Sequence, residues 1–264
     1  MLAVQDLEIR VGARLLMADV SFRVDKGDKV GLVGRNGAGK TTMTRALAGE
    51  GQPTGGTITR TGEIGYLPQD PRAGDPEQLA RTRILDARGL GSIVLELQQA
   101  GVEMGSDDPA VAEKAMARYS RLTDRFQSLG GYSAEAEAAA IASNLNLPDR
   151  ILGQPLSTLS GGQRRRIELA RILFSDAETM ILDEPTNHLD ADSVVWLREF
   201  LKAYQGGFIV ISHDVALVEE TVNRVFYLDG NRQVIDIYNM GWKHYLRQRE
   251  ADAERRKKER ANVE

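Results

Sequence analysis

Apolar and polar residues alternate in several short stretches of this chain, as expected for β-strands with one buried face. The alternation covers residues 2–9 and 20–24, so the first 33 residues are predicted to be rich in β-structure. Residues 29–33, Lys-Val-Gly-Leu-Val, form an apolar run instead, which is typical of a buried strand. Further strands are predicted at residues 57–59, 63–67, 179–182, 208–211, 225–228 and 234–237.

From about residue 70 the pattern changes to helical spacing in a segment rich in Ala, Glu, Leu and Arg. Residues 71–76 contain two prolines and are interpreted as a linker into this segment. Four helices are predicted, within residues 79–85, 93–97, 116–126 and 133–145. We interpret residues 70–158, approximately, as a helical insertion.

Beyond the insertion, strands and helices alternate again. The α/β core is expected to resume at Ser160 with a helix that continues to about Phe174, and another helix is predicted from Asp190 to Tyr204. Alternation of this kind predicts an α/β fold with a mostly parallel sheet and helices on both of its faces.

Residues 34–41, Gly-Arg-Asn-Gly-Ala-Gly-Lys-Thr, fit the pattern G-x-x-x-x-G-K-[ST] between a predicted strand and a predicted helix. Glycines let backbone N–H groups converge on phosphate oxygens, and the helix N-terminus adds partial positive charge. Lys40 is expected to reach the β- and γ-phosphates, and the Thr41 hydroxyl to bind Mg²⁺. The candidate nucleotide-binding residues are Gly34, Arg35, Asn36, Gly37, Ala38, Gly39, Lys40, Thr41 and Thr42.

The apolar strand before Asp183 and Glu184 ends in two adjacent acids, which a buried strand should not do without a cation nearby. Asp183 is expected to hold Mg²⁺, directly or through water, and Glu184 to orient or deprotonate the attacking water. The alternative is a solvated strand end before a turn at Pro185. Gln69 is placed to approach Mg²⁺ and the water. His213 is placed to contact the γ-phosphate, although a lone His there is often only a strand-end residue.

A second glycine-rich stretch, Ser160-Gly161-Gly162-Gln163, opens the next predicted helix. Its backbone amides form an anion site by the same logic as the first loop. One phosphate loop does not need two such sites, so we expect this one to serve another domain's nucleotide. Ser160 as a simple helix N-cap is the alternative, and both roles are compatible.

Composition narrows the class of protein. The 264 residues are 42% hydrophobic and 27% charged, as in an ordinary soluble globular protein, and contain no cysteine, which fits a reducing cytoplasm. No apolar run approaches 18 residues, and the N-terminus lacks a basic segment before an apolar core, so neither a membrane span nor a secretion signal is predicted. The net charge of −4 conceals a basic tail.

Residues 241–260 of this tail hold eight Lys or Arg and four acids, a net charge of +4 that leaves −8 for the rest. With few apolar residues after Leu246, the predicted helix here cannot be packed in a core. A solvated helix that frays is the alternative to an interaction element.

These motifs, in this order, resemble those of the ATP-binding-cassette (ABC) ATPases. The resemblance covers residues 1 to about 240, in which Gln69, Glu184 and His213 match the family's Q-loop, catalytic glutamate and switch histidine. It implies an ABC-type P-loop ATPase with an N-terminal antiparallel β subdomain and an inserted α-helical subdomain. It also implies that ATP and Mg²⁺ lie between one cassette's phosphate loop and another cassette's Leu-Ser-Gly-Gly-Gln signature in a head-to-tail dimer.

Two stretches resemble the ABC-F group more narrowly: residues 183–190, Asp-Glu-Pro-Thr-Asn-His-Leu-Asp, and the arginine-rich residues 159–171. ABC-F proteins are soluble, carry two cassettes on one chain, bind the ribosome, and modulate translation or protect it from antibiotics. Transporter cassettes usually have Ser-Ala-Leu-Asp where this chain has Asn-His-Leu-Asp, ending at Asp190, a further candidate nucleotide-site residue. The resemblance implies that residues 241–264 begin the helical linker to the second cassette.

The expectation is therefore the N-terminal half of a cytoplasmic ABC-F ATPase, with the first nucleotide-binding domain and the start of the linker, cut within that linker. Its implied partners are a second cassette, in the same full-length chain or in a head-to-tail homodimer, and the ribosome with its rRNA and tRNA. The alternative is the ATPase subunit of a transporter, with a membrane subunit as partner. A non-hydrolysing module is disfavoured by Glu184. One position departs from the family: Val11 stands where an aromatic residue usually stacks on adenine, which leaves base selectivity open.

Overall fold

The computed structural model describes residues 1–70 and 74–261, which form two compact units. The first unit comprises residues 1–70, 177–187 and 194–264, and the second comprises residues 71–176 and 188–193. The first three residues of the predicted linker at 71–76 lie outside the described residues, as do the last three of the basic tail. No helix in the described ranges is long and apolar enough to cross a membrane.

A three-stranded antiparallel sheet with the strand order β2-β1-β4 forms one part of the first unit. Its strands are β1 (Leu2–Val11), β2 (Arg14–Val24) and β4 (Gly55–Arg60). Leu2 and Val4, and then Leu7 and Ile9, are buried, so the predicted alternation is present but shifts by one residue at the irregularity between Val4 and Leu7. This sheet confirms the predicted N-terminal antiparallel β subdomain.

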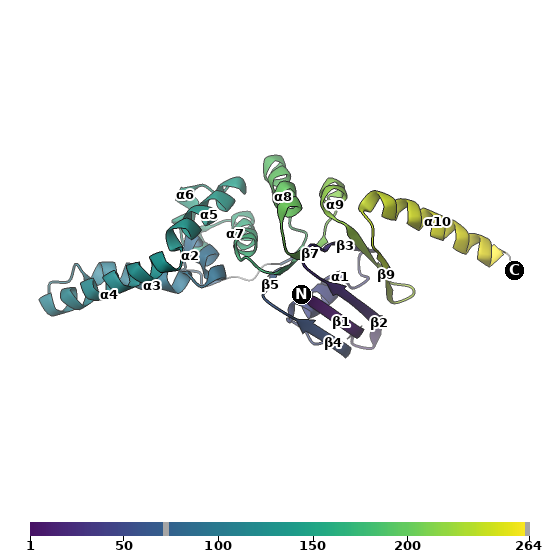
Figure 1. Cartoon of the computed structure of the whole chain (residues 1–264), viewed down its shortest axis with the longest axis horizontal. Coiled ribbons are helices and arrows are strands. Elements are labelled where there is room, and N and C mark those ends of the chain that lie inside the picture. The colour runs from purple at the N-terminus through teal and green to yellow at the C-terminus, as the bar shows by residue number, and fades with distance from the viewer. Residues whose placement is uncertain (71–73, 262–264) are drawn as a thin grey trace. The chain divides into compact units, whose positions relative to one another are not determined.

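A six-stranded sheet with the order β5-β6-β7-β3-β8-β9 is the centre of the same unit (Figure 1). The strands are β3 (Lys29–Gly34), β5 (Ile64–Leu67), β6 (Thr179–Asp183), β7 (Gly207–Ile211), β8 (Arg224–Asp229) and β9 (Val234–Tyr238). All neighbours are parallel except β8 and β9. Every residue of β6 and β7 is buried, which explains their continuous apolar sequences.

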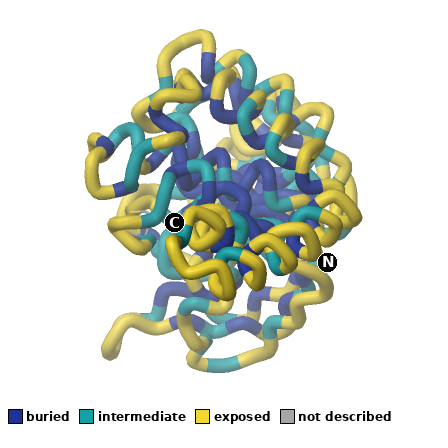
Figure 2. Tube along the Cα trace, turned by 90° about the vertical axis from the view of Figure 1, so that its left-hand side faces the viewer, coloured by how far each residue is buried: buried dark blue, intermediate teal, exposed yellow. Residues whose placement is uncertain are grey.

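Successive residues of β3 face different helices. Gly31 lies against Val218 and Val222 at helix α9 (Val215–Thr221), whereas Leu32 belongs to the core cluster that includes Met43 and Leu47 of α1 (Lys40–Ala48). This core also joins the two sheets, since the rings of Phe22 and Phe226 meet edge to face at 4.8 Å. Figure 2 shows the buried residues, in dark blue, running through the interior of the trace.

Two more helices belong wholly or mostly to this unit: α8 (Ala191–Ala203), whose first residues fall in the second unit, and α10 (Trp242–Ala261). The start of α10 is docked, because Tyr245 is fully buried and the Arg249 guanidinium lies 3.8 Å from the centre of the Tyr227 ring. The residues after it are almost all exposed. The tail is thus helical; its role as a linker stays a prediction.

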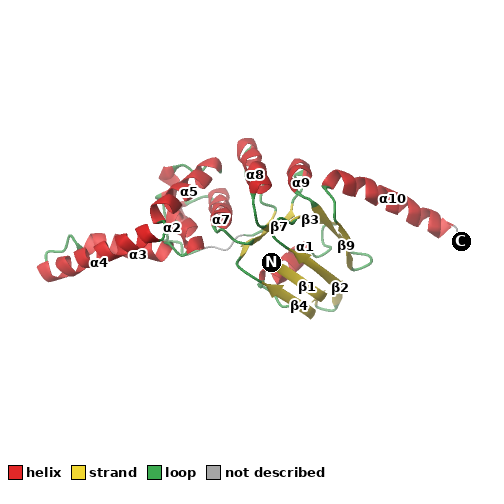
Figure 3. Ribbon diagram, viewed as in Figure 1, coloured by secondary structure: helices red, strands yellow, loops and turns green. Residues whose placement is uncertain are grey.

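The second unit contains no β-strand in its described part and is built from helices, drawn red in Figure 3. They are α2 (Ala80–Leu85), α3 (Gly91–Glu103), α4 (Pro109–Ser128), α5 (Gly131–Asn144), α6 (Asp149–Leu152) and α7 (Gly161–Phe174), with single 3₁₀ turns at η1 (Asp86–Arg88) and η2 (Leu156–Thr158).

The helical insertion was expected to end near residue 158, but helix α7 also belongs to the helical unit. It packs against α2 and α5, so the helical unit extends to residue 176 and the core does not resume at Ser160. Most of the apolar residues of α7 are buried, and Glu168 of α7 also accepts hydrogen bonds from Arg83 of α2 at 2.8 Å and from Arg171 of α7 at 2.9 Å. Sequence alternation alone does not reveal which body a helix packs on.

Candidate functional site

The phosphate-loop sequence forms the turn between β3 and α1. Gly37 and Gly39 adopt φ values of 80° and 109°, which side-chain-bearing residues rarely adopt. A Cβ on Gly39 would also stand 2.9 Å from Cδ1 of Leu16. The Lys40 ammonium curls back to donate a hydrogen bond of 2.6 Å to the carbonyl oxygen of Gly34. Burial lowers the pKa of Lys40, against the opposing effect of the Glu184 and Asp183 carboxylates.

Asp183 ends β6 beside the first turn of α1. Its side chain accepts a hydrogen bond of 3.0 Å from the Thr41 hydroxyl and is buried, with the residue 2% exposed. The hydroxyl oxygen of Thr41 and a carboxylate oxygen of Asp183 therefore lie side by side. Hydroxyl and carboxylate oxygens are ligands that Mg²⁺ prefers.

Glu184 leaves the strand in a left-handed conformation, with φ of 52°, and its backbone N–H donates to the carbonyl oxygen of Ile211 at 2.8 Å. Its carboxylate accepts a hydrogen bond of 3.3 Å from the backbone N–H of His213 and lies 3.2 Å from Nε2 of the same residue. Burial raises the pKa of Glu184, and the contacts with His213 partly oppose that shift. The carboxylate is thus held in place and is a better proton acceptor than an exposed one.

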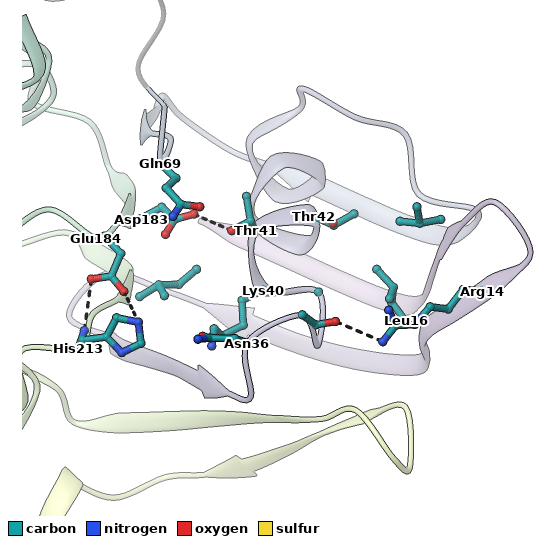
Figure 4. Close-up of a pocket in the computed structure, with 14 residues that line it drawn as sticks. Arg14, Leu16, Asn36, Lys40, Thr41, Thr42, Gln69, Asp183, Glu184 and His213 are labelled. Atoms are coloured by element: carbon teal, nitrogen blue, oxygen red, sulfur yellow. Dashed lines mark hydrogen bonds and ion pairs between the residues drawn. The ribbon is translucent and has the colours of Figure 1, made fainter. Parts of the chain in front are cut away.

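A cavity of about 490 Å³ joins these groups (Figure 4). It brings together ten of the predicted residues: Asn36, Gly37, Gly39, Lys40, Thr41, Thr42, Gln69, Asp183, Glu184 and His213. Three residues of the predicted phosphate loop do not line it, because Gly34 and Ala38 support the loop and Arg35 faces solvent. Val11, Arg14, Leu16 and Ile211 complete the lining.

Arg14, Leu16 and Ile211 were missed as site residues by sequence reasoning. Arg14 reaches the loop and donates a hydrogen bond of 3.3 Å to the carbonyl oxygen of Gly37. The turn at Gly12 was the available sequence signal, because it makes Arg14 the cross-strand partner of Val11.

The second predicted anion site belongs to the other unit. Ser160 is the N-cap of α7, and its hydroxyl and the Gln163 side chain bond each other's backbone N–H groups at 3.1 and 2.9 Å. The N-cap interpretation of Ser160 is therefore confirmed, and the anion site at Gly161 and Gly162 stays a prediction. Asp190 accepts a hydrogen bond of 2.8 Å from the backbone N–H of Ser193, which lowers the pKa of Asp190.

The donor set around Thr41 fits Mg²⁺. Among the described residues no cluster of three or more His, Asp or Glu side chains forms a dedicated metal site. Thr41, Asp183 and the Gln69 amide instead line one cavity as oxygen donors. Mg²⁺ typically takes one or two protein carboxylates together with substrate phosphates and water, which this arrangement permits.

Comparison with known proteins agrees with this geometry. Residues 17–187 match the family model described as ABC transporter. The chain is 36% identical over 260 residues to the tylosin resistance ATP-binding protein TlrC of Streptomyces fradiae, covering 95% of this chain and 46% of that protein. It is 34% identical over 223 residues to the energy-dependent translational throttle protein EttA of Haemophilus influenzae, covering 82% and 39%. The chain thus spans less than half the length of these relatives, which confirm the resemblance to the ABC-F group.

Solved structures show the same fold at lower identity. An ATP-binding subunit of an ABC transporter superposes with a TM-score of 0.67 at 20% identity, over 90% of both chains. An ATP-binding cassette solved as a dimer in a post-hydrolysis state, bound to ADP and Pi, gives a TM-score of 0.61 at 18% identity, over 90% of this chain and 98% of that one.

Proposed function

Because the chain belongs to the ABC transporter family, we propose that it binds ATP and hydrolyses it to ADP and phosphate in a Mg²⁺-dependent reaction. The observation that carries this proposal is the convergence of Lys40, the Thr41–Asp183 pair and the Glu184–His213 pair on one cavity. Each pair supplies one requirement of phosphoryl transfer: a place for the metal and a held proton acceptor for water.

In this mechanism the loop amides and Lys40 bind the phosphates and stabilise the charge that develops on them. Thr41, Asp183 and Gln69 would hold Mg²⁺, which neutralises phosphate charge when bound. Glu184 orients the attacking water and accepts its proton. His213, bonded to both Glu184 carboxylate oxygens, fixes the direction of that carboxylate and is available to the γ-phosphate.

The signature residues are proposed to act on a neighbour's nucleotide. Ser160, Gly161, Gly162 and Gln163 lie at a helix N-terminus in the helical unit, whereas the phosphate loop belongs to the first unit. A complete site then needs two cassettes, each giving its signature to the other. The partner cassette is either in the same full-length chain or in a second copy, and Asp190 lies in the same unit as the signature.

We further propose a role on the ribosome, in translation or in protection from antibiotics, at a cytoplasmic site of action. The resistance and translational relatives support this class, and so does the exposed, basic end of α10. The ATPase subunit of a membrane transporter remains the second candidate, favoured by the likeness to a transporter subunit at the level of fold.

Two substitutions test the ATPase. Lys40→Ala removes the phosphate contact, so ATP binding itself should weaken. Glu184→Gln keeps the shape and ATP binding but should lower the hydrolysis rate by about 10²–10⁴-fold, the usual contribution of a positioned base. Phosphate release and nucleotide binding are measured together, with Glu96→Gln, an exposed glutamate of α3, as control. A native hydrolysis rate in Glu184→Gln would show that the roles are wrongly assigned.

A further inference from the structure

The end of the cavity away from His213 is formed by a hairpin. Val11 and Arg14 are directly opposite partners at the end of β1 and the start of β2, joined by Gly12 with φ of 59° and Ala13. Opposite residues of an antiparallel pair place their side chains on the same face. Both side chains line the cavity, which is why this short turn contributes two neighbouring groups to it.

Leu16 forms an apolar wall beside this hairpin. It is 6% exposed and lies so close to the loop that a Cβ on Gly39 would touch it. In Figure 4, Lys40 stands between Arg14 on one side and Glu184 with His213 on the other. A nucleotide whose terminal phosphate meets Glu184 and Lys40 therefore extends its nucleoside toward Val11, Arg14 and Leu16.

We propose that the Arg14 guanidinium is the platform on which the nucleotide base stacks, and that it gives the site little selectivity between adenine and guanine. This inference rests on the proposed nucleotide binding at the phosphate loop. A guanidinium is planar, delocalised and weakly hydrated, so it stacks on aromatic faces as a side-chain ring does. Every base has such a face, and stacking alone is tolerant of base identity.

The surroundings of Arg14 fit this role. Its hydrogen bond to the Gly37 carbonyl oxygen ties the side chain to the loop, and among the described residues no carboxylate forms an ion pair with it. Val11, which is 55% exposed, and Leu16 are apolar. Specific recognition of a base edge needs polar groups placed at that edge. Of the residues that line this end, Arg14 is the one that offers hydrogen-bond donors.

A positive charge near the loop has a competing role, attraction to the phosphates. The two roles differ in what they require of the ligand. Stacking requires a base, whereas charge acts equally on a phosphate chain that has none. Lysine supplies the charge without the planar group, so Arg14→Lys separates them from the protein side.

The experiment measures dissociation constants of ADP, GDP and inorganic pyrophosphate, each with Mg²⁺, by calorimetry on the 264-residue chain. In the unsubstituted chain GDP should bind within about tenfold of ADP. Arg14→Ala and Arg14→Lys should each raise the dissociation constants of ADP and GDP about tenfold. The dissociation constant of pyrophosphate should change by less than about twofold. Adding Val11→Tyr to Arg14→Ala supplies a ring on the opposite strand and should restore ADP binding.

Several results would overturn the inference. Equal loss of affinity for ADP and pyrophosphate in Arg14→Ala would show that Arg14 acts on the phosphates. Full retention of ADP affinity in Arg14→Lys would show the same. Unchanged ADP affinity in Arg14→Ala would show that the base binds elsewhere. So would a double variant, Arg14→Ala with Val11→Tyr, that does not recover ADP binding. Pyrophosphate binding reports in each variant that the loop is folded. If the unsubstituted chain bound neither ADP nor pyrophosphate, the proposed function itself would fail first.

Discussion

The conformation of the phosphate loop at Gly39 requires a residue without a Cβ. Its φ of 109° is unfavourable for any residue with a Cβ, and Leu16 occupies the space that a methyl group would need. The backbone there must also keep its amides directed at phosphate. A change at this position therefore acts on both strain and binding.

Gly39→Ala should weaken ADP binding by about five- to thirtyfold, because a non-glycine residue at positive φ costs roughly 1–2 kcal/mol and about 1.4 kcal/mol is a factor of ten. The control is Gly153→Ala, at a φ of −84° where a Cβ would have no neighbour closer than 3.9 Å. Calorimetry measures the dissociation constant of ADP for both variants. Unchanged binding in Gly39→Ala would show that the loop adapts, and that the left-handed conformation is not needed for the ligand.

Among the elements, α7 carries a buried charge cluster beside its buried apolar residues. Glu168 has a side chain only 8% exposed, and it is shared by Arg83 and Arg171, which are 19% and 25% exposed. Removing one partner of a buried ion pair leaves the other charge without compensation. The cluster links α2 to α7 inside the helical unit.

Glu168→Ala should lower the free energy of unfolding of the helical unit by about 3–5 kcal/mol. Both tryptophans, Trp196 and Trp242, belong to the first unit, whereas circular dichroism reports helices of both. In urea titrations, the unfolding midpoint followed by circular dichroism should therefore shift more than the midpoint followed by tryptophan fluorescence. Glu137→Ala is the matched control, since its bond to Arg88 is at the surface and should be worth under about 1 kcal/mol. Equal effects of the two substitutions would contradict the buried-cluster argument.

Most elements were predictable because their signals are local. The strands at 179–182 and 208–211 are apolar runs, and the phosphate loop is a spaced pattern of glycines before Lys40. Helix α9 was missed because seven residues are too few for a period to show; its N-cap Asp214, which accepts from the Leu217 N–H at 2.9 Å, was the available signal. The assignment of α7 depends on contacts distant in sequence, which a pattern along the chain does not contain. The turn at Gly12 indicates that Arg14 pairs with Val11, but not that Arg14 contacts Gly37 of the phosphate loop.

For the whole molecule, the two proposed anion sites fall in different units, and under the proposed function this division makes activity depend on a partner. The phosphate loop lies in the first unit and the Ser160–Gln163 signature in the second. If each signature serves a neighbour's nucleotide, one cassette alone has an incomplete site. Activity then depends on meeting a partner.

The 264-residue chain should accordingly be mainly monomeric without ATP and hydrolyse ATP slowly, with a rate per molecule that rises with protein concentration. ATP together with Glu184→Gln, which blocks turnover, should shift it toward a head-to-tail dimer. Sedimentation or light scattering across a dilution series measures both states. Fast turnover that is independent of concentration would reveal a self-sufficient monomer and remove the argument for a shared site.

The proposed role on the ribosome predicts a function for the exposed end of α10. Its basic residues are Arg255, Arg256, Lys257, Lys258 and Arg260. Their side chains are exposed, although Arg255 pairs with Asp252 and Glu259 at 3.4 and 3.9 Å, and Arg256 pairs with Asp236 at 3.9 Å. The earlier Arg249 contacts Tyr227 and Tyr245. Full-length protein carrying Glu184→Gln should co-sediment with ribosomes when ATP is bound. Contacts of Lys and Arg with RNA phosphates release counterions, so this binding should weaken steeply with salt.

Reversing these five charges to Glu should lower ribosome affinity and make its salt dependence less steep, by about one unit of log–log slope for each phosphate that the tail no longer neutralises. ATP binding at Lys40 should be unchanged, because the phosphate loop and the tail are separate elements; its measurement is the control for folding. Reversal of Lys114, an exposed residue of α4, is the control for a charge change elsewhere. Trapped full-length protein that ignored ribosomes at low salt but bound a membrane subunit would replace the ribosomal proposal with the transporter one.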